Sequence, residues 1–262
     1  MKYNTASPAS AGRGVHKIRI LRRAAFSKPE PHDTILYMRH IAVIIYGPPG
    51  SGKGTQANLL SWNLGLIHFD TGRFCEQLVH DPANQGDPVI QRERKLFDTG
   101  MLMTPSFVLT VVKEKTDAIA KAGLDIVYSG SPRTMYEAFG DASAEGLIPF
   151  LERVYGKDNI RIVMMKIEPQ DAIKRNKVRL VCSVCRTPVM EGSGNSSCSI
   201  CGGALTKRTL DSTDVLETRI REYEERTFPI IEELEKREYV VRRIDARPLP
   251  YEIHKTITGY IG

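Results

Sequence analysis

No long hydrophobic run occurs anywhere in the 262 residues. A membrane-spanning helix needs roughly 18 or more consecutive apolar residues. The longest apolar stretch, residues 41–46, is only long enough for a buried strand. We therefore expect no membrane partner. Hydrophobic residues at 41 % and charged residues at 26 % fit one globular domain that carries insertions.

Acidic residues are missing from the first 29 positions, although Lys and Arg recur there. The net charge of +6 is therefore concentrated at one end of the chain, and the rest is nearly neutral. A nucleic-acid groove spreads its positive charge over the folded domain. This asymmetry argues against a nucleic-acid partner.

Residues 1–37 contain Pro, Ser, Ala and Gly in quantity and show little apolar periodicity. Such a segment buries too little apolar surface to fold alone, so we predict a disordered basic extension. Its Arg-rich start resembles an organelle transit peptide, whereas Met38 stands just before the first predicted strand and could begin translation. We expect a cytoplasmic protein, with organelle targeting as the alternative.

The core, residues 38–262, alternates short runs rich in Val and Ile with longer helical patterns. This alternation predicts a parallel sheet with helices on both faces, an α/β three-layer sandwich. Strands are predicted at 41–46, 66–69, 125–129, 160–167 and 239–244, and helices at 53–63, 72–79, 88–97, 105–122, 146–155, 170–179, 212–237 and 251–260. Two segments interrupt the alternation and are predicted to be insertions, residues 70–100 and residues 180–211.

A glycine-rich segment, GPPGSGKGT at residues 47–55, links the first predicted strand to the first predicted helix and fits G-x-x-x-x-G-K-[ST]. Its glycines let the backbone curl so that N–H groups point at phosphate oxygens, and the helix adds its positive end. Lys53 is expected to reach the β and γ phosphates, and the Thr55 hydroxyl to face Mg²⁺. The predicted nucleotide-binding residues are Gly47, Gly50, Ser51, Gly52, Lys53, Gly54 and Thr55.

Two cysteine pairs, Cys182-x2-Cys185 and Cys198-x2-Cys201, use four of the five cysteines and are separated by 12 residues. Four thiolates suit tetrahedral Zn²⁺ and leave no open coordination position, so we predict a structural zinc that holds a small flap without a core of its own. Two disulfides are the alternative. The scarcity of cysteine elsewhere indicates a reducing compartment and favours the metal.

In this order, the phosphate loop, the two insertions and the cysteine pairs resemble the long adenylate kinases with a zinc-binding lid, over residues 41–261. The other matching motifs are Asp70-Thr71-Gly72, Gly130-Ser131-Pro132-Arg133-Thr134, Arg175-x3-Arg179-x2-Cys182 and Arg208-x10-Arg219. The resemblance implies a nucleoside monophosphate kinase that moves a phosphoryl group reversibly from Mg·ATP to AMP and gives two ADP. We expect a monomer.

The resemblance also implies roles for the cationic residues. Residues 180–211 would be the lid over ATP, with Arg179 touching ATP from the base of the lid and Arg247 near the ATP base. The residues expected at the phosphates in transit are Lys53, Arg133, Arg175, Arg208 and Arg219. Planar guanidinium groups suit this task because each binds two phosphate oxygens and stays charged.

Residues 70–100 would be the mobile monophosphate-binding segment. Arg133 would grip the acceptor phosphate, while the Thr71 side chain and backbone at Met101 to Met103 would border the acceptor base. The complete acceptor set implied is Thr71, Gly72, Arg73, Met101, Met103, Gly130, Arg133, Glu137, Arg208 and Arg219.

Three positions depart from the family pattern on the acceptor side. Glu76 stands where an arginine is usual, and Arg73, on nearly the same helical face, is expected to replace it. Ser129 stands where a carboxylate usually orders water around Mg²⁺. Glu137 replaces a glutamine that reads adenine, and a carboxylate only accepts hydrogen bonds.

Two alternatives therefore stay open beside AMP phosphorylation. Glu137 could also suit guanine, so the acceptor could be GMP or a broader range. A module that binds adenine nucleotides without turnover is the second alternative, but the retained Lys53 and arginines argue against it.

Overall fold

Five parallel strands form the central sheet, in the order β2-β3-β1-β4-β8. Their bounds are β1 Ala42–Tyr46, β2 Ile67–Phe69, β3 Ile126–Tyr128, β4 Ile160–Lys166 and β8 Val241–Asp245. The computed structural model describes residues 40–189, 194–207 and 209–262. The predicted extension, 1–37, lies outside the described residues, as does Arg208. The α/β prediction with a parallel sheet is confirmed.

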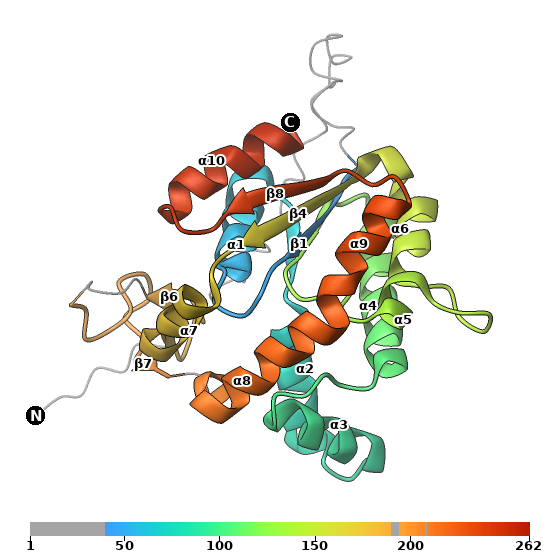
Figure 1. Cartoon of the computed structure of the whole chain (residues 1–262). Coiled ribbons are helices and arrows are strands. Elements are labelled where there is room, and N and C mark those ends of the chain that lie inside the picture. The colour runs from blue at the N-terminus through green and yellow to red at the C-terminus, as the bar shows by residue number, and fades with distance from the viewer. Residues whose placement is uncertain (1–39, 190–193, 208) are drawn as a thin grey trace, which may run out of the picture. The chain divides into compact units, whose positions relative to one another are not determined.

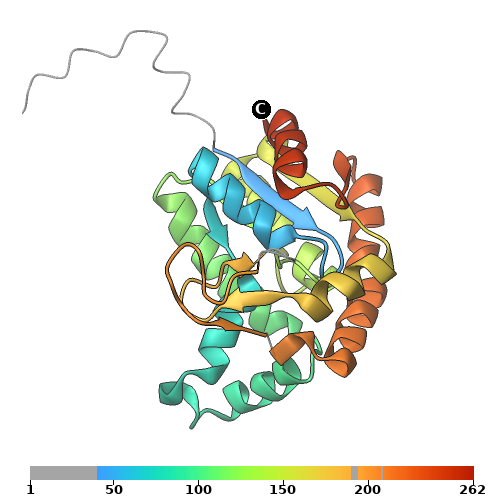
Figure 2. The same cartoon turned by 90° about the vertical axis from the view of Figure 1, so that its left-hand side faces the viewer.

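Helices cover both faces of this sheet (Figures 1 and 2). On one face lie α1 (Lys53–Leu64) and α10 (Pro250–Ile261). The other face is covered by α4 (Pro105–Lys121), α5 (Met135–Phe139), α6 (Leu147–Tyr155) and α9 (Phe228–Lys236). This is the three-layer arrangement that the alternating sequence pattern predicted.

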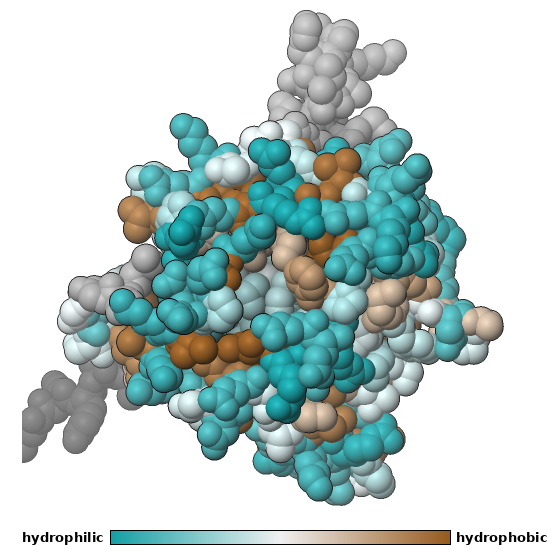
Figure 3. All heavy atoms as spheres, viewed as in Figure 1, coloured by the Kyte–Doolittle hydropathy of each residue, from teal (hydrophilic) through white to brown (hydrophobic). Residues whose placement is uncertain are grey.

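The two cores follow from the alternation of side chains along the strands. Val43 and Ile45 of β1 pack with α1 and α10, whereas Ala42 and Ile44 pack on the opposite side. All of β1 is buried, and burying each such aliphatic side chain stabilises the fold by about 1.5–3 kcal/mol. Hydrophilic residues cover most of the molecular face that Figure 3 shows.

Two groups of short elements lie outside these layers. The first contains α2 (Thr71–His80), η1 (Pro82–Asn84) and α3 (Pro88–Asp98), which lie below the sheet in Figures 1 and 2. The second is an antiparallel sheet of order β6-β5-β7 with α7 before it: α7 Pro169–Val178, β5 Leu180–Cys182, β6 Pro188–Val189 and β7 Leu205–Thr206. The sequence did not predict this small sheet.

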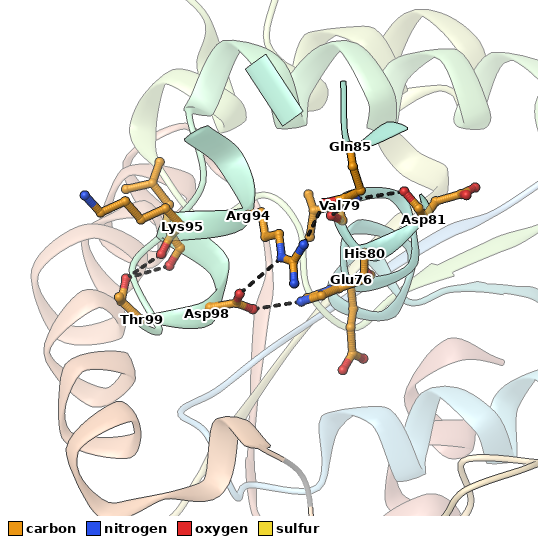
Figure 4. Close-up of polar contacts among 10 residues, drawn as sticks. Glu76, Val79, His80, Asp81, Gln85, Arg94, Lys95, Asp98 and Thr99 are labelled. Atoms are coloured by element: carbon orange, nitrogen blue, oxygen red, sulfur yellow. Dashed lines mark hydrogen bonds and ion pairs between the residues drawn. The ribbon is translucent and has the colours of Figure 1, made fainter. Parts of the chain in front are cut away.

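A chain of polar contacts joins α2 to α3 (Figure 4). The His80 ring lies 2.8 Å from the Glu76 carbonyl oxygen and 2.9 Å from Asp98 Oδ1. Arg94 lies 3.6 Å from the same carboxylate and donates to Gln85 Oε1 at 2.6 Å. These contacts hold the two helices together at their exposed ends.

The helix predicted over residues 212–237 is present as one uninterrupted helical segment from Thr213 to Lys236, but a π turn that was not predicted divides it. The segment is α8 (Thr213–Glu222), a π-helical turn η4 (Tyr223–Thr227) and then α9. Pro229 lies in the first turn of α9 and has no N–H to donate into the preceding turn. A π turn absorbs such a missing bond, and here the Phe228 N–H donates to the Tyr223 carbonyl.

Other differences are smaller. The last strand begins at Val241 rather than at 239, because its pairing with β4 starts at Ile162 and Val241. Tyr239 instead packs in the core. Helix α5 was not predicted, and neither were the short turns η2 (Lys157–Asn159) and η3 (Thr209–Asp211). In the part of the chain that the structure describes, no helix has the length and apolar character to cross a membrane.

Candidate functional site

The loop between β1 and α1 has a backbone that only glycine allows. Gly47, Gly50 and Gly52 have φ values of 147°, 88° and 87°. A Cβ at Gly50 would lie 2.4 Å from Asn176 Nδ2 and 2.5 Å from the Ala172 carbonyl oxygen. No side chain caps the start of α1, so its first N–H groups are available to an anion.

Lys53 turns back over this loop. Its Nζ donates to the Gly47 carbonyl at 2.5 Å and to the Pro48 carbonyl at 2.9 Å. Burial lowers the pKa of Lys53 well below its usual value, and the positive charges of Arg133, Arg219 and Arg179 lower it further. The loop is therefore surrounded by cations, which is an arrangement that favours a polyanionic ligand.

A cleft of about 510 Å³ opens at this loop, within the range of small-molecule sites. The predicted site residues that line it are Gly47, Gly50, Ser51, Gly52, Lys53, Gly54, Thr55, Gly72, Met101, Gly130, Arg133, Arg175, Arg179, Arg219 and Arg247. Four others lie outside its lining: Thr71, Arg73, Met103 and Glu137. The structure thus brings together segments that are far apart in the sequence.

Asp211 holds two of the arginines. Arg179 donates to both carboxylate oxygens of Asp211, at 2.9 and 2.6 Å. Arg219 lies 3.5 Å from the same carboxylate and donates to the Leu210 carbonyl at 3.1 Å. Because the Asp211 side chain is only 4 % exposed, this shared carboxylate fixes both guanidinium groups. Sequence reasoning missed Asp211, although its place three residues after Arg208 is a usable signal.

Arg175 and Arg179 lie differently from the sequence expectation. Arg175 donates to the Ala246 and Arg247 carbonyls, at 2.7 and 3.1 Å, which places it beside the loop after β8. Arg179, which was expected on ATP from the base of the lid, lines the cleft, and its charge acts on Lys53 together with those of Arg133 and Arg219. Arg247 forms an exposed ion pair with Asp245 at 2.7 Å.

Arg133 lies on the acceptor side of the cleft. Its Nε donates to the Gly130 carbonyl at 2.7 Å. Its Nη2 lies close to Gly72, since a Cβ added at that glycine would be 3.5 Å from it. Asp70 caps α2 by accepting from the Arg73 N–H at 3.1 Å, and the Arg73 side chain is exposed. Arg73 therefore does not lie beside Arg133 in the cleft lining.

Glu137 does not face the cleft, contrary to the sequence expectation. Its Oε2 accepts from the Arg133 N–H at 2.9 Å and its Oε1 from the Thr134 hydroxyl at 3.1 Å. The Glu137 N–H donates to Thr134 Oγ1, so Thr134 caps the start of α5 and the Glu137 carboxylate holds the Thr134 hydroxyl. Burial raises the pKa of Glu137, and the Arg133 N–H lowers it in part. Met103 and Thr71 are also buried.

The four cysteines of the second insertion lie together. Their sulfur atoms all lie within 4.8 Å of one another, with 3.4 Å between those of Cys182 and Cys201 and 3.6 Å between those of Cys185 and Cys198. All four are free thiols, so the disulfide alternative is not what the structure contains. Sulfurs around a tetrahedral Zn²⁺ lie about 3.8 Å apart, so the spacing fits that ion. Hydrogen bonding with Thr187 lowers the pKa of Cys185 to about 6, which favours a thiolate.

Comparison with known proteins agrees with this geometry. The family model described as adenylate kinase matches residues 45–239. The chain is 27 % identical over 227 residues to an adenylate kinase of Chlamydia trachomatis serovar D, covering 82 % of this chain and 87 % of that protein. It is 30 % identical over 188 residues to the Chlamydia pneumoniae adenylate kinase, covering 72 % and 82 %. It is 29 % identical over 196 residues to the Borreliella burgdorferi adenylate kinase, covering 73 % and 85 %.

Proposed function

The chain belongs to the adenylate kinase family and is an ATP-dependent nucleoside monophosphate kinase, and from this premise we propose how its residues transfer a phosphoryl group from ATP to AMP. The observation that supports the proposal most strongly is that the guanidinium groups of Arg133, Arg179 and Arg219 line the same cleft as Lys53 and the phosphate loop. Family membership does not favour a different acceptor or a module without turnover.

On the donor side, backbone N–H groups of residues 50–55 bind the phosphates of ATP. Lys53 exchanges its two carbonyl partners for β- and γ-phosphate oxygens when ATP enters. Arg175, with Arg247 beside it, borders the ATP base at the loop after β8. The Ser51 hydroxyl is buried without a partner in the described structure, which fits a loop completed by an anion.

Mg²⁺ fits the same place. Thr55 lines the cleft two residues after Lys53, and its hydroxyl would hold the ion. When bound, Mg²⁺ would neutralise charge on the phosphates of ATP.

Transfer itself needs alignment and charge stabilisation rather than a covalent residue. Arg133 holds the phosphate of AMP, and Arg179 and Arg219 hold the group in transit. Arg208, outside the described residues, joins them in this proposal. Because Asp211 fixes Arg179 and Arg219 before substrate arrives, little reorganisation is needed during the reaction.

The acceptor lies between Arg133 and the first insertion. Gly72 and Gly130 let the AMP phosphate approach Arg133, and backbone at Met101 borders its base. The Thr71 hydroxyl is buried without a partner in the described structure, and a small rotation would let it reach the base. Arg73, which is exposed, reaches the acceptor phosphate only if α2 moves inward, so residues 70–100 act as a mobile flap.

Residues 180–211 form the second flap, a lid over ATP that a structural zinc holds in shape. Cys182, Cys185, Cys198 and Cys201 are its four ligands. Closing both flaps excludes water, which would otherwise accept the phosphoryl group. We also place the protein in the cytoplasm as a monomer, where a reducing environment keeps these thiols free.

An initial-rate assay with ATP and each of AMP, GMP, CMP and UMP tests the proposal. We expect ADP to form with AMP as the preferred acceptor. Arg133→Ala should lower kcat/KM by about 100-fold or more, since it removes a charge-assisted contact to the phosphate. Arg153→Ala is the matched control, because Arg153 pairs with Glu145 away from the cleft. Equal rates for all four acceptors, or an unaffected Arg133→Ala enzyme, would contradict the proposal.

A further inference from the structure

One hydrogen bond joins the segment between α8 and α9 to Arg133. The Thr227 hydroxyl donates to the Arg133 carbonyl oxygen at 2.8 Å, although the two residues are 94 positions apart in the sequence. Thr227 is only 6 % exposed, so water competes little for this bond. Replacing the hydroxyl by a methyl group would leave the carbonyl without this partner, which carries a desolvation cost.

The π turn η4 places Thr227 on the cleft side of its helical segment. Arg219, Tyr223 and Thr227 all line the cleft. In a regular α-helix, the eight residues from Arg219 to Thr227 would overshoot two full turns by about 80°. A π turn takes about one more residue per turn, so η4 brings Thr227 back toward the face that carries Arg219. The helices α8 and α9 follow one another on either side of this turn (Figure 1).

Protein groups hold Arg133 at three points. Its N–H donates to the Glu137 carboxylate at 2.9 Å, and its carbonyl accepts from Thr227. Its Nε donates to the Gly130 carbonyl at 2.7 Å. Among the residues that the structure describes, neither terminal nitrogen of the Arg133 guanidinium has a hydrogen-bond partner. The backbone is therefore fixed, while the end of the side chain stays available to an anion.

We propose that Thr227 is a positioning residue for the acceptor phosphate, because it ties the Arg133 backbone to the helical segment that carries Arg219. Groups that act on one reacting phosphate must be held within about 0.5 Å of their working geometry. Thr227 and Arg133 both lie outside residues 70–100 and 180–211, so this alignment does not depend on closure of either flap. The inference rests on the function proposed above.

The test is calorimetric binding of AMP to the full chain, together with initial rates for ATP and AMP. Thr227→Val keeps the shape of the side chain and removes the donor. It should raise the dissociation constant of AMP and lower kcat/KM for AMP by about three- to tenfold, the effect of one hydrogen bond. KM for ATP should not change. Thr227→Ser keeps the hydroxyl and should restore most of the affinity, and Thr227→Ala serves if the valine variant does not fold.

A double-mutant cycle shows whether Thr227 acts through Arg133. Arg133→Ala removes the guanidinium, so Thr227→Val should add nothing to its loss of kcat/KM for AMP. The loss of stability caused by Thr227→Val should persist in the double variant, because the carbonyl at position 133 is still there.

Thr116→Val is the matched control. Thr116 is buried and also donates its hydroxyl to a backbone carbonyl, that of Val112 at 2.7 Å, but it lies on α4 outside the cleft lining. This substitution should lower stability and leave AMP binding unchanged.

Three results would overturn the proposal. They are equal losses of AMP affinity in Thr227→Val and Thr227→Ser, additive losses of kcat/KM in the double variant, and a loss of AMP affinity in Thr116→Val as large as that in Thr227→Val. The proposed function fails separately. A wild-type chain that binds AMP with the expected dependence on Thr227, but makes no ADP, would contradict phosphoryl transfer and support the positioning role.

Discussion

At the scale of single residues, the phosphate loop needs glycine for two reasons: its backbone has positive φ, and neighbouring atoms leave no space for a side chain. Gly50 has positive φ, and any side chain there meets Asn176 and the Ala172 carbonyl. Gly259 of α10, by contrast, has no atom within 4 Å of an added Cβ. The same substitution should therefore have opposite effects at the two positions.

We expect Gly50→Ala to destabilise the protein by about 2 kcal/mol or more and to abolish ATP binding, because strain and overlap act together. Gly259→Ala should stabilise it by up to about 1 kcal/mol, since alanine is the better helix former. Chemical unfolding of both variants beside the wild type measures the difference. A Gly50→Ala chain as stable as the wild type would show that the loop relaxes freely.

Glu137 yields a pH prediction. Its folded-state pKa is raised by burial, so the folded protein holds this proton more tightly than the unfolded chain does. The contribution of Glu137 to stability is thus fully present below the unfolded pKa and is lost as the pH rises through the folded pKa. Glu137→Gln removes this titration.

We expect the stability advantage of the wild type over Glu137→Gln to shrink as the pH rises from about 4 to neutrality. The preference among AMP, GMP, CMP and UMP should not change, because Glu137 holds the Thr134 cap of α5 and does not line the cleft. Denaturant unfolding at several pH values, together with the four-acceptor assay, checks both parts. A switch toward GMP or away from AMP would restore the earlier interpretation of Glu137.

At the scale of elements, we expect the exposed contacts that join α2 to α3 to affect acceptor binding more than global stability. Asp98 accepts from His80 on α2 and lies near Arg94 on its own helix (Figure 4). Both ring nitrogens of His80 lie within hydrogen-bond distance of acceptor oxygens, those of the Glu76 carbonyl and the Asp98 carboxylate. The contact is a polar link within the proposed acceptor flap.

Asp98→Ala should cost only about 0.5 kcal/mol of global stability, since both partners are more than a third exposed. It should raise KM for AMP about two- to fivefold and leave KM for ATP unchanged, because only the acceptor flap is loosened. Asp117→Ala, which breaks the exposed pair with Lys121 on α4, is the control. Equal changes in both KM values would argue against a separate flap.

At the scale of the whole molecule, the cluster of four cysteines and the phosphate loop lie in different parts of the fold, and we expect them to unfold separately. In the small sheet β6-β5-β7 only Val181 and Cys182 are buried, whereas the loop is attached to the fully buried strand β1. A metal held by the four cysteines would therefore contribute folding energy to this part of the chain, while the core depends on its own packing.

We expect one Zn²⁺ per chain by elemental analysis. Cys198→Ser should remove it, lower Tm and cut kcat at least tenfold, while amide exchange in β1 and β4 stays slow. Cys75→Ala is the control, because Cys75 is a buried residue of α2 and lies outside the cluster of four sulfurs. Full metal content in Cys198→Ser would contradict the four-cysteine site.

The sequence by itself determined the layers of the core, the phosphate loop and which four cysteines lie together. The alternation of side chains along a strand, the backbone freedom of glycine and the spacing of the cysteines are local properties. Each depends on residues that are close together in the sequence, so each can be read from it. Only the tertiary structure decided that Asp211 holds Arg179 and Arg219, that Arg175 turns to the loop after β8, and that Glu137 holds the cap of α5. These are contacts between groups whose partners are chosen by packing and by competition for buried hydrogen bonds.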